Sequence, residues 1–353
     1  MNRPAQLVWK QPIRWWFTLL LIVVTTASMR SYGLATWPWE YDELASFMEL
    51  GLYPPEEHSD YQLRTIVKFV PVWYALQHAF LSVLPHDELG SRILPALCGT
   101  LTVVGLSAFA YYHRGLGLAV ALAVLLNGNV LLLHLSQVNR FYTLPLLFVA
   151  LALMGIWARS EGFVPLAVTV GCAALAMLSH SLALIPFGIA ALASTATWLL
   201  GWERRATAVR ALSAAAVAGL IYLAWVRPNM EGWIGSAPQP GLHTLMSFAS
   251  YLGIPTLALG LFGAAAALVH REARSDMAWW AISAAGVLLF MLLVPWLMPI
   301  WHPPYHLLFM LPFWITGAFA VDLVARRLAA PRLSAAWYGC VIVLLLPGVV
   351  SHY

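Results

Sequence analysis

Long apolar stretches separated by short polar breaks recur along the chain. Each has about 17 to 25 residues, the length that a helix needs to cross a hydrocarbon core about 30 Å thick. The pattern predicts helices over residues 15–36, 92–112, 115–136, 142–158, 163–179, 182–200, 209–226, 247–269, 278–298, 305–325 and 335–351. It therefore indicates an all-α polytopic membrane protein with about eleven transmembrane helices.

The composition points the same way. Hydrophobic residues make up 61% of the chain, charged residues make up 10%, and the mean hydropathy is +0.77. Soluble domains carry about 25% charged residues, so a soluble fold could not bury this much apolar surface. The net charge of +4 fits cytoplasmic anchoring of loops and gives no reason to expect a nucleic-acid partner. We expect the three cysteines, Cys98, Cys172 and Cys340, to be buried packing residues because they lie far apart in apolar runs.

One further apolar run, residues 70–84, is short, contains Gln77 and His78, and has Pro71 near its start. If this run does not cross the membrane, thirteen of the nineteen Lys and Arg residues lie in the cytoplasm; if it crosses, only six do. The thirteen are Arg3, Lys10, Arg14, Arg114, Arg159, Arg204, Arg205, Arg210, Arg271, Arg274, Arg326, Arg327 and Arg332. Because Lys and Arg collect in cytoplasmic loops, residues 70–84 are predicted to form a juxtamembrane or re-entrant helix.

The same topology makes residues 37–91 the first extracytoplasmic loop and residues 228–246 a later one, within a single transmembrane module that covers residues 1–353. The first apolar run follows Arg3, Lys10 and Arg14, and a signal peptide is its alternative interpretation; either leaves the next segment outside.

Six basic residues fall on the extracytoplasmic side, against the positive-inside trend. They are Arg30, Arg64, Lys68, Arg92, Arg140 and Arg227. As a group they suggest an anionic ligand there, although pairing with loop acids is an equal alternative for any one of them.

Asp42 and Glu43 are the candidate acid–base pair. Leu44, Phe47 and Met48 follow at helical spacing, so the pair would stand at the start of an amphipathic interfacial helix. The structural alternative is a helix N-cap. The functional interpretation rests on position, because a partly desolvated carboxylate beside an anion-binding patch suits general-base work.

Several other segments could contribute to the same face. Lys68 precedes Trp73 and Tyr74, the segment 136–142 carries Arg140 and Tyr142, and the segment 301–306 opens the tenth helix with aromatic residues and two histidines. His180 is a ligand contact or a satisfied interhelical histidine. Weaker candidates have structural interpretations: Asn127 and Asn129 as polar contacts between helices, and Asp322 with Arg326 as a local ion pair.

Motifs for nucleotides and metals are absent from the sequence. There is no phosphate-binding P-loop, no dinucleotide-binding glycine pattern after a strand and no spaced metal signature. Glu56, Glu57, His58 and Asp60 could hold a divalent cation, but a solvated acidic loop is the favoured interpretation. We therefore expect no required cofactor, with a divalent cation left open.

The order of these features resembles the type C (GT-C) glycosyltransferases that use polyprenyl-phosphate sugars, in the protein O-mannosyltransferase and aminoarabinose transferase-like superfamily. The resemblance covers about residues 37–312. It is carried by the pair Asp42-Glu43, by the segments 68–74, 90–97, 136–142 and 233–238, and by His180. The sequence departs from the family pattern in having the single Pro71, Tyr305-His306 where Arg-Tyr is expected, no arginine closely following Asp42-Glu43, and no soluble C-terminal domain.

The resemblance implies an inverting transfer of one sugar from a polyprenyl-phosphate donor to a lipid, glycan or protein acceptor, within membrane lipids. It implies Asp42 and Glu43 as catalytic residues. The implied phosphate-binding residues are Lys68, Arg140, Tyr142, Arg227, His302 and His306, and the implied substrate-binding residues are Glu40, Tyr74, His180 and Tyr305. The expected location is a bacterial inner membrane, with the site facing the extracytoplasmic side.

Two other functions remain open on sequence grounds. In a secondary transporter or lipid flippase, the same acids and bases would mark a translocation path. A non-catalytic assembly subunit would tolerate loss of Asp42. Transporters place ionisable groups near the bilayer midplane, whereas here the predicted helix centres are almost free of them. The sequence does not specify the sugar, the acceptor, the prenyl chain length or the oligomeric state.

Overall fold

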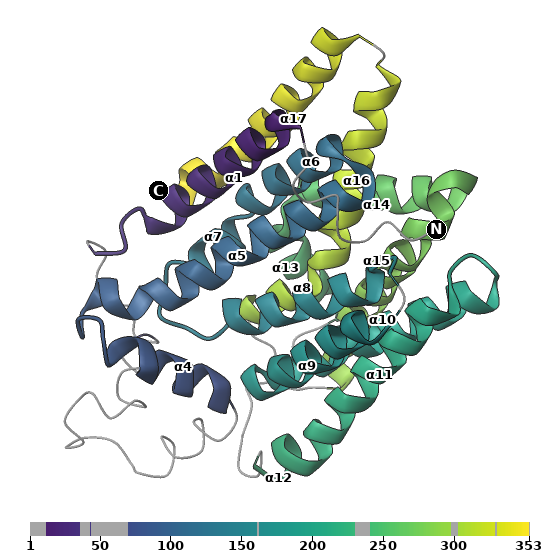
Figure 1. Cartoon of the computed structure of the whole chain (residues 1–353). Helices are drawn as coiled ribbons and strands as arrows, with labels where there is room; N and C mark the ends of the chain where they lie inside the picture. Colours follow the sequence, from purple (N-terminus) through teal and green to yellow (C-terminus); the bar gives the residue numbers. More distant parts are fainter. Residues whose placement is uncertain are drawn as a thin grey trace.

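The chain forms a bundle of helices, and the residues that the structure describes include no strand (Figure 1). The computed structural model describes residues 12–35, 43, 70–160, 162–229, 241–297, 303–328 and 330–352. The long helices are α1 (Ile13–Ser31), α5 (Glu88–Arg114), α8 (Thr143–Trp157), α9 (Phe163–Ser179), α10 (Leu184–Leu199), α11 (Arg205–Ile221), α14 (Ile254–Val269), α15 (Arg271–Leu297), α16 (Leu311–Arg327) and α17 (Pro331–His352). Shorter elements are α4 (Pro71–Leu81), α6 (Leu116–Asn127), α7 (Val130–Leu135), η1 (Ser181–Ala183), η2 (Tyr222–Val226), α12 (Arg227–Asn229), α13 (Gly241–Leu252) and η3 (Pro303–Phe309).

Each of the eleven predicted stretches is helical over most of its length, and the all-α polytopic fold is confirmed. Six described helices are long and apolar enough to cross a membrane unbroken, and α13 with α14 forms a bent seventh candidate. Helices α6, α8 and α9 are equally apolar but shorter. The chain is therefore a multi-pass membrane protein.

The main departure from the predicted helices is at residues 247–269, which were expected to form one straight span. The structure divides them into α13 and α14, whose axes differ by 99°. Gly253 lies at the corner with φ of 87°, a left-handed conformation that side chains disfavour, and Pro255 follows in the first turn of α14. Hydropathy cannot reveal this corner because the residues on both sides are apolar.

The short helix α4 confirms the interpretation of residues 70–84 as a segment that does not span. Its 11 residues extend about 16 Å, roughly half the thickness of a hydrocarbon core. Trp73, Tyr74 and Gln77 are buried, and α4 packs against α5 and α9 at one end of the bundle (Figure 1).

Small residues and side-chain amides hold the helices together. A Cβ atom added at Gly263 of α14 would lie 1.8 Å from the carbonyl oxygen of Thr316 in α16, so only glycine allows this approach. Asn127 accepts from Arg30 at 2.7 Å and donates to Thr26 at 2.9 Å, linking α6 to α1. Asn129 donates to the carbonyl of Tyr251 at 3.0 Å, so both asparagines make the predicted contacts between helices.

Bases assigned to the cytoplasm do gather at one end of the bundle. Asp276 is within 2.5 Å of Arg159 and 3.4 Å of Arg114, and the local pair of Asp322 with Arg326 is confirmed at 2.8 Å. This clustering agrees with the topology derived from charge.

The expectation for the cysteines holds only in part. Cys98 is buried, Cys172 is half-buried and Cys340 is exposed. Helix α17 lies at the edge of the bundle (Figure 1). Several of its apolar side chains are exposed, Cys340 among them, so lipid would contact them.

We expect Gly263→Ala to destabilise the protein by about 1–3 kcal/mol, because the added methyl group would push α14 away from α16. Gly219→Ala in α11 is the matched control: nothing lies within 4 Å of its added Cβ, so the change should be neutral or stabilising. Thermal unfolding in detergent would compare them, and equal midpoints would contradict the close contact.

Candidate active site

A buried ion pair joins the first loop to α5. Arg92 donates from Nε to Glu43 Oε1 at 2.8 Å and from Nη2 to Glu43 Oε2 at 2.6 Å, which is the two-pronged geometry that Arg and carboxylates favour. Their side chains are 1% and 0% exposed. Arg92 Nη1 also donates to the carbonyl of Leu34 at 3.1 Å, so the pair is tied to the end of α1. The Asp87 side chain caps α5 by accepting from the Gly90 N–H at 2.8 Å, which sets Arg92 in the second turn.

A chain of hydrogen bonds extends from Glu43 to two other elements. The backbone N–H of Asn139 donates to Glu43 Oε1 at 2.6 Å. The Gln77 amide of α4 donates to Asn139 Oδ1 at 2.9 Å and to the carbonyl of Ser91 at 2.7 Å. The turn after α7, α4 and the start of α5 are therefore fixed around one carboxylate.

Of the two predicted catalytic acids, the structure describes Glu43. Three N–H donors point at its carboxylate, an arrangement that holds this side chain in place. Asp42, the preceding residue, lies outside the described residues.

Aromatic rings and a histidine gather beside the turn that carries Asn139. The ring centroids of Tyr142 and His180 are 6.1 Å apart, those of Tyr142 and Tyr305 are 6.2 Å apart, and those of His180 and Tyr305 are 5.3 Å apart. His180 lies in the turn between α9 and η1, where its Nδ1 accepts from the Leu182 N–H at 3.1 Å. Nε2 therefore carries the proton of the neutral ring, and burial lowers the pKa of His180 to about 4. This group can offer a neutral donor and flat apolar faces.

His306 turns toward a different neighbour. Its Nε2 is 3.1 Å from Ser247 Oγ of α13, and its ring lies against Phe248 and Tyr251, with centroids 5.6 and 5.9 Å away. Tyr305 therefore lies beside the starts of α8 and η1, whereas His306 lies beside α13. The corner between α13 and α14 brings Ser247 to this position.

The remaining predicted residues are distributed unevenly. Arg140 adjoins Asn139, and its guanidinium lies 5.6 Å from the centre of the Phe141 ring. Arg227 is exposed on α12, and Tyr74 is buried against Leu94 and other apolar residues. Glu40, Asp42, Lys68 and His302 lie outside the part of the chain that the structure describes.

Three residues of the network were not among the predicted site residues: Arg92, Gln77 and Asn139. From the sequence, Arg92 was singled out only as one of six bases on the extracytoplasmic side. Its pairing with Glu43 matches the alternative interpretation, in which such bases pair with acids of the loop. Gln77 was visible as a polar residue in a short apolar run. Asn139 could not be singled out because its backbone N–H, rather than its side chain, contacts Glu43.

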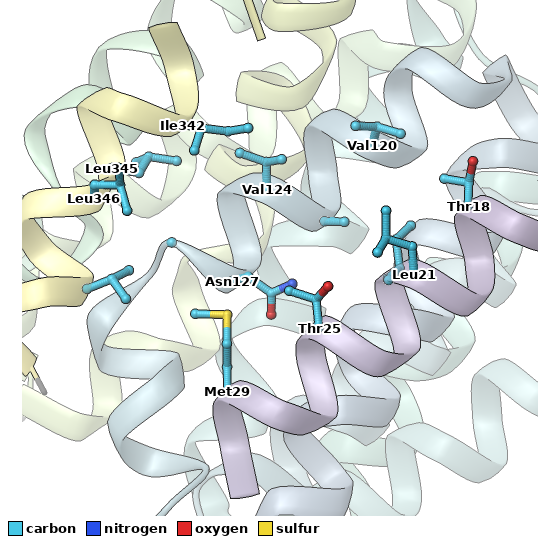
Figure 2. A pocket seen from close by; sticks show the side chains of 14 residues that line it. Thr18, Leu21, Thr25, Met29, Val120, Val124, Asn127, Ile342, Leu345 and Leu346 are labelled. Carbon is cyan, nitrogen blue, oxygen red and sulfur yellow. The ribbon is translucent and has the colours of Figure 1, made fainter. Parts of the chain in front are cut away.

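An apolar groove of about 420 Å³ opens between α1, α6 and α17 (Figure 2). Leu21 of α1, Val124 of α6 and Leu345 of α17 are among the residues that line it, and Thr25, Met29 and Asn127 lie at one end. The carbonyl of Met29 accepts from the Gln137 amide at 2.8 Å, two residues before Asn139. This end of the groove therefore adjoins the elements that hold Glu43.

The described residues contain no group of three or more His, Cys, Asp or Glu side chains placed to hold a metal ion. The predicted acidic candidates at positions 56–60 lie outside them.

No protein-family model matches the sequence, and no curated protein matches it. Two similar solved structures are of ArnT from Cupriavidus metallidurans, in the apo state and bound to undecaprenyl phosphate. The apo structure has a TM-score of 0.66 at 11% identity and the bound structure 0.63 at 13%. The matches cover 92% and 95% of this chain, and 62% and 70% of the respective ArnT chains, so this chain spans about two thirds of their length. The GT-C-like fold that the sequence predicts is therefore confirmed.

We expect Glu43→Gln to destabilise the protein by about 3–5 kcal/mol, because it removes the carboxylate charge that binds the buried Arg92 guanidinium through two hydrogen bonds. Arg92→Gln should cost a similar amount, and the double variant should cost less than the sum of the two. Arg159→Gln, which breaks a more exposed pair, should cost about 0–1 kcal/mol. Unfolding in detergent would measure all four variants; additive losses from Glu43→Gln and Arg92→Gln would contradict the pairing.

Proposed function

We propose that the chain is a membrane glycosyltransferase that moves one sugar from a polyprenyl-phosphate donor to an extracytoplasmic acceptor, with inversion. The observation that carries the proposal is the locked Glu43 carboxylate, because Asp42 precedes it in the chain and Arg140 follows Asn139, whose backbone N–H binds Glu43. The GT-C-like fold supports it, as does the undecaprenyl phosphate bound in one similar structure.

In the proposed reaction, Asp42 is the general base. It takes the proton of an acceptor hydroxyl as that oxygen attacks the anomeric carbon from the face opposite the phosphate. The bond between the anomeric carbon and the phosphate oxygen breaks, its electron pair stays on the phosphate, and polyprenyl phosphate leaves. Glu43 acts as a positioning residue, since its oxygens are occupied by Arg92 and Asn139.

Negative charge grows on the phosphate as the sugar leaves, so fixed positive groups beside it lower the barrier. Arg140 and Lys68 are assigned this role, with His306 as a neutral donor anchored by Ser247. The rings of Tyr142 and Tyr305 and the neutral His180 would contact the sugar, whose apolar faces pack on aromatic rings and whose hydroxyls need hydrogen-bond partners. The exposed position of Arg227 assigns it to a more peripheral contact.

The groove between α1, α6 and α17 is the proposed place for the prenyl chain of the donor. It is almost wholly apolar, and the Met29 carbonyl at its end is hydrogen-bonded to Gln137, in the turn that holds Glu43. A chain lying in the groove would thus present its phosphate to the first loop. Its volume of about 420 Å³ falls in the range of about 300–1,000 Å³ that is usual for bound small molecules.

Sugar transfer by purified protein in detergent, from a panel of radiolabelled polyprenyl-phosphate sugars, tests the proposed reaction. We expect Asp42→Asn to lower the rate by about 10²- to 10⁴-fold, because the base is lost. Arg140→Ala should lower the rate by about 10²-fold, because the leaving phosphate loses a positive neighbour.

Arg205→Ala, an exposed base on α11, is the control and should leave transfer unchanged. Full activity of a folded Asp42→Asn protein would refute the assigned base. If Arg140→Ala loses transfer while Asp42→Asn keeps it, the residues essential for the reaction lie in the 136–142 turn instead.

Val124→Trp tests the assignment of the groove. Because the indole would fill the space between α6 and α17, the KM for a long-chain donor should rise about tenfold, which corresponds to about 1.4 kcal/mol. The KM for a donor with a prenyl chain too short to enter the groove should not change. Leu220→Trp, at an exposed position on α11, is the control. Equal effects on both donors would place the prenyl chain elsewhere.

A further inference from the structure

A second pocket lies at the opposite end of α5 from the ion pair of Glu43 and Arg92. It has a volume of about 540 Å³. Arg114 ends α5 and is 22 residues beyond Arg92, so about 33 Å of helix separates the pocket from the candidate active site. The other lining residues come from the junction of α14 with α15, from the first turn of α15 and from the last turns of α16: His270, Ala273, Phe319, Asp322, Leu323, Arg326 and Arg327. The topology derived from charge places this end in the cytoplasm.

The described lining of this pocket has an excess of positive charge, with three arginines and one aspartate. Arg326 Nη2 is 2.8 Å from Asp322 Oδ2. Arg327 Nη2 lies 3.0 Å from His270 Nε2. Since a guanidinium can only donate, this His270 nitrogen accepts the hydrogen bond. Asp322 therefore neutralises one of the three arginines that line the pocket.

Arg114 is the most enclosed of these cations. One of its Nη atoms is 3.4 Å from Asp276, a carboxylate that Arg159 approaches more closely, at 2.5 Å. Its Nε is buried and has no hydrogen-bond partner among the described residues. Its guanidinium lies 5.2 Å from the centre of the Phe319 ring. Because Arg114 Nη2 is held by Asp276 only at 3.4 Å, a phosphate oxygen entering the pocket would be stabilised by a charged hydrogen bond from this guanidinium.

Retention of bases in the cytoplasm explains why arginines occur at this end, but it does not explain a pocket. Arg205 and Arg332 meet the same topological requirement as exposed side chains outside it. Arg114, Arg326 and Arg327 instead surround a space that also has an apolar wall of Phe319 and Leu323. Guanidinium groups bind phosphate oxygens in two-pronged fashion, and basic pockets between membrane helices suit phospholipid headgroups.

We propose that this pocket binds the phosphate of an anionic phospholipid in the cytoplasmic leaflet, with Arg114, Arg326 and Arg327 as its ligands and Phe319 and Leu323 beside the start of the acyl chains. Such a lipid would connect the ends of α5, α15 and α16. The site is independent of the sugar transfer proposed above, and binding can be measured without any turnover.

Native mass spectrometry and thermal unfolding of the full chain in detergent test this site with three probes. They are phosphatidylglycerol, phosphatidylcholine with the same acyl chains, and inorganic phosphate. We expect phosphatidylglycerol to remain bound and to raise the unfolding temperature, and the other two probes to do neither at equal concentration. Equal retention of the two lipids, or displacement of phosphatidylglycerol by inorganic phosphate, would overturn the assignment to an anionic lipid.

Variants locate the binding. The double variant Arg326→Gln with Arg327→Gln should weaken phosphatidylglycerol binding by about tenfold or more, since charged hydrogen bonds to the phosphate are lost. Arg205→Gln and Arg332→Gln, which remove the same kind of charge at the same end, should bind as the wild type does. Unchanged binding by the double variant would refute the site.

Arg114→Lys keeps the charge and removes the planar guanidinium that can bind two phosphate oxygens, so it tests the site if the double variant does not fold. It should also bind phosphatidylglycerol more weakly, and wild-type affinity in this variant would exclude Arg114 as a ligand.

Discussion

The arrangement of one end of the bundle depends on one buried ion pair. Glu43 comes from the first loop, and Arg92 belongs to the second turn of α5. Two charges taken out of water are tolerated only when their hydrogen-bonding groups are matched, and here Asn139 and Leu34 supply the additional partners. Satisfying this pair therefore fixes four segments together: the end of α1, the first loop, α5 and the turn after α7. Gln77 adds α4 to the group.

This dependence explains how an apolar bundle can hold a polar site. Between membrane helices the hydrophobic effect gives little specificity, so close packing and polar contacts determine how helices meet. Gly263 allows α14 to approach α16, while Asn127 and Asn129 make hydrogen bonds to residues of neighbouring helices. The ion pair at one end of the bundle and the arginine pocket at the other both use α5, in which Arg92 lies in the second turn and Arg114 is the last residue.

Much of the fold could be predicted from the sequence, because a membrane imposes a length on each apolar run and a side on each base. The eleven stretches and the short α4 follow from those two constraints. The corner at Gly253 does not follow from them. Its φ of 87° lets α13 turn and pack against η3, and the hydropathy of the surrounding residues does not indicate this turn. For the site, the topology predicted from the sequence places five candidate residues at one end of the bundle: Glu43, Arg140, Tyr142, His180 and Tyr305. It could not reveal that Glu43 is held by Arg92, because their pairing spans 49 residues.

That pairing also changes how two adjacent acids should be interpreted. A pair such as Asp42-Glu43 suggests two groups sharing one chemical task, yet successive residues rarely point into the same environment. Once the oxygens of Glu43 are occupied by Arg92 and Asn139, its neighbour is attached to a fixed point of the bundle by a single peptide unit. A base attached in this way loses less conformational freedom when a substrate binds than one on an untethered loop. The anchoring acid thus contributes to the proposed reaction through the position of the other acid.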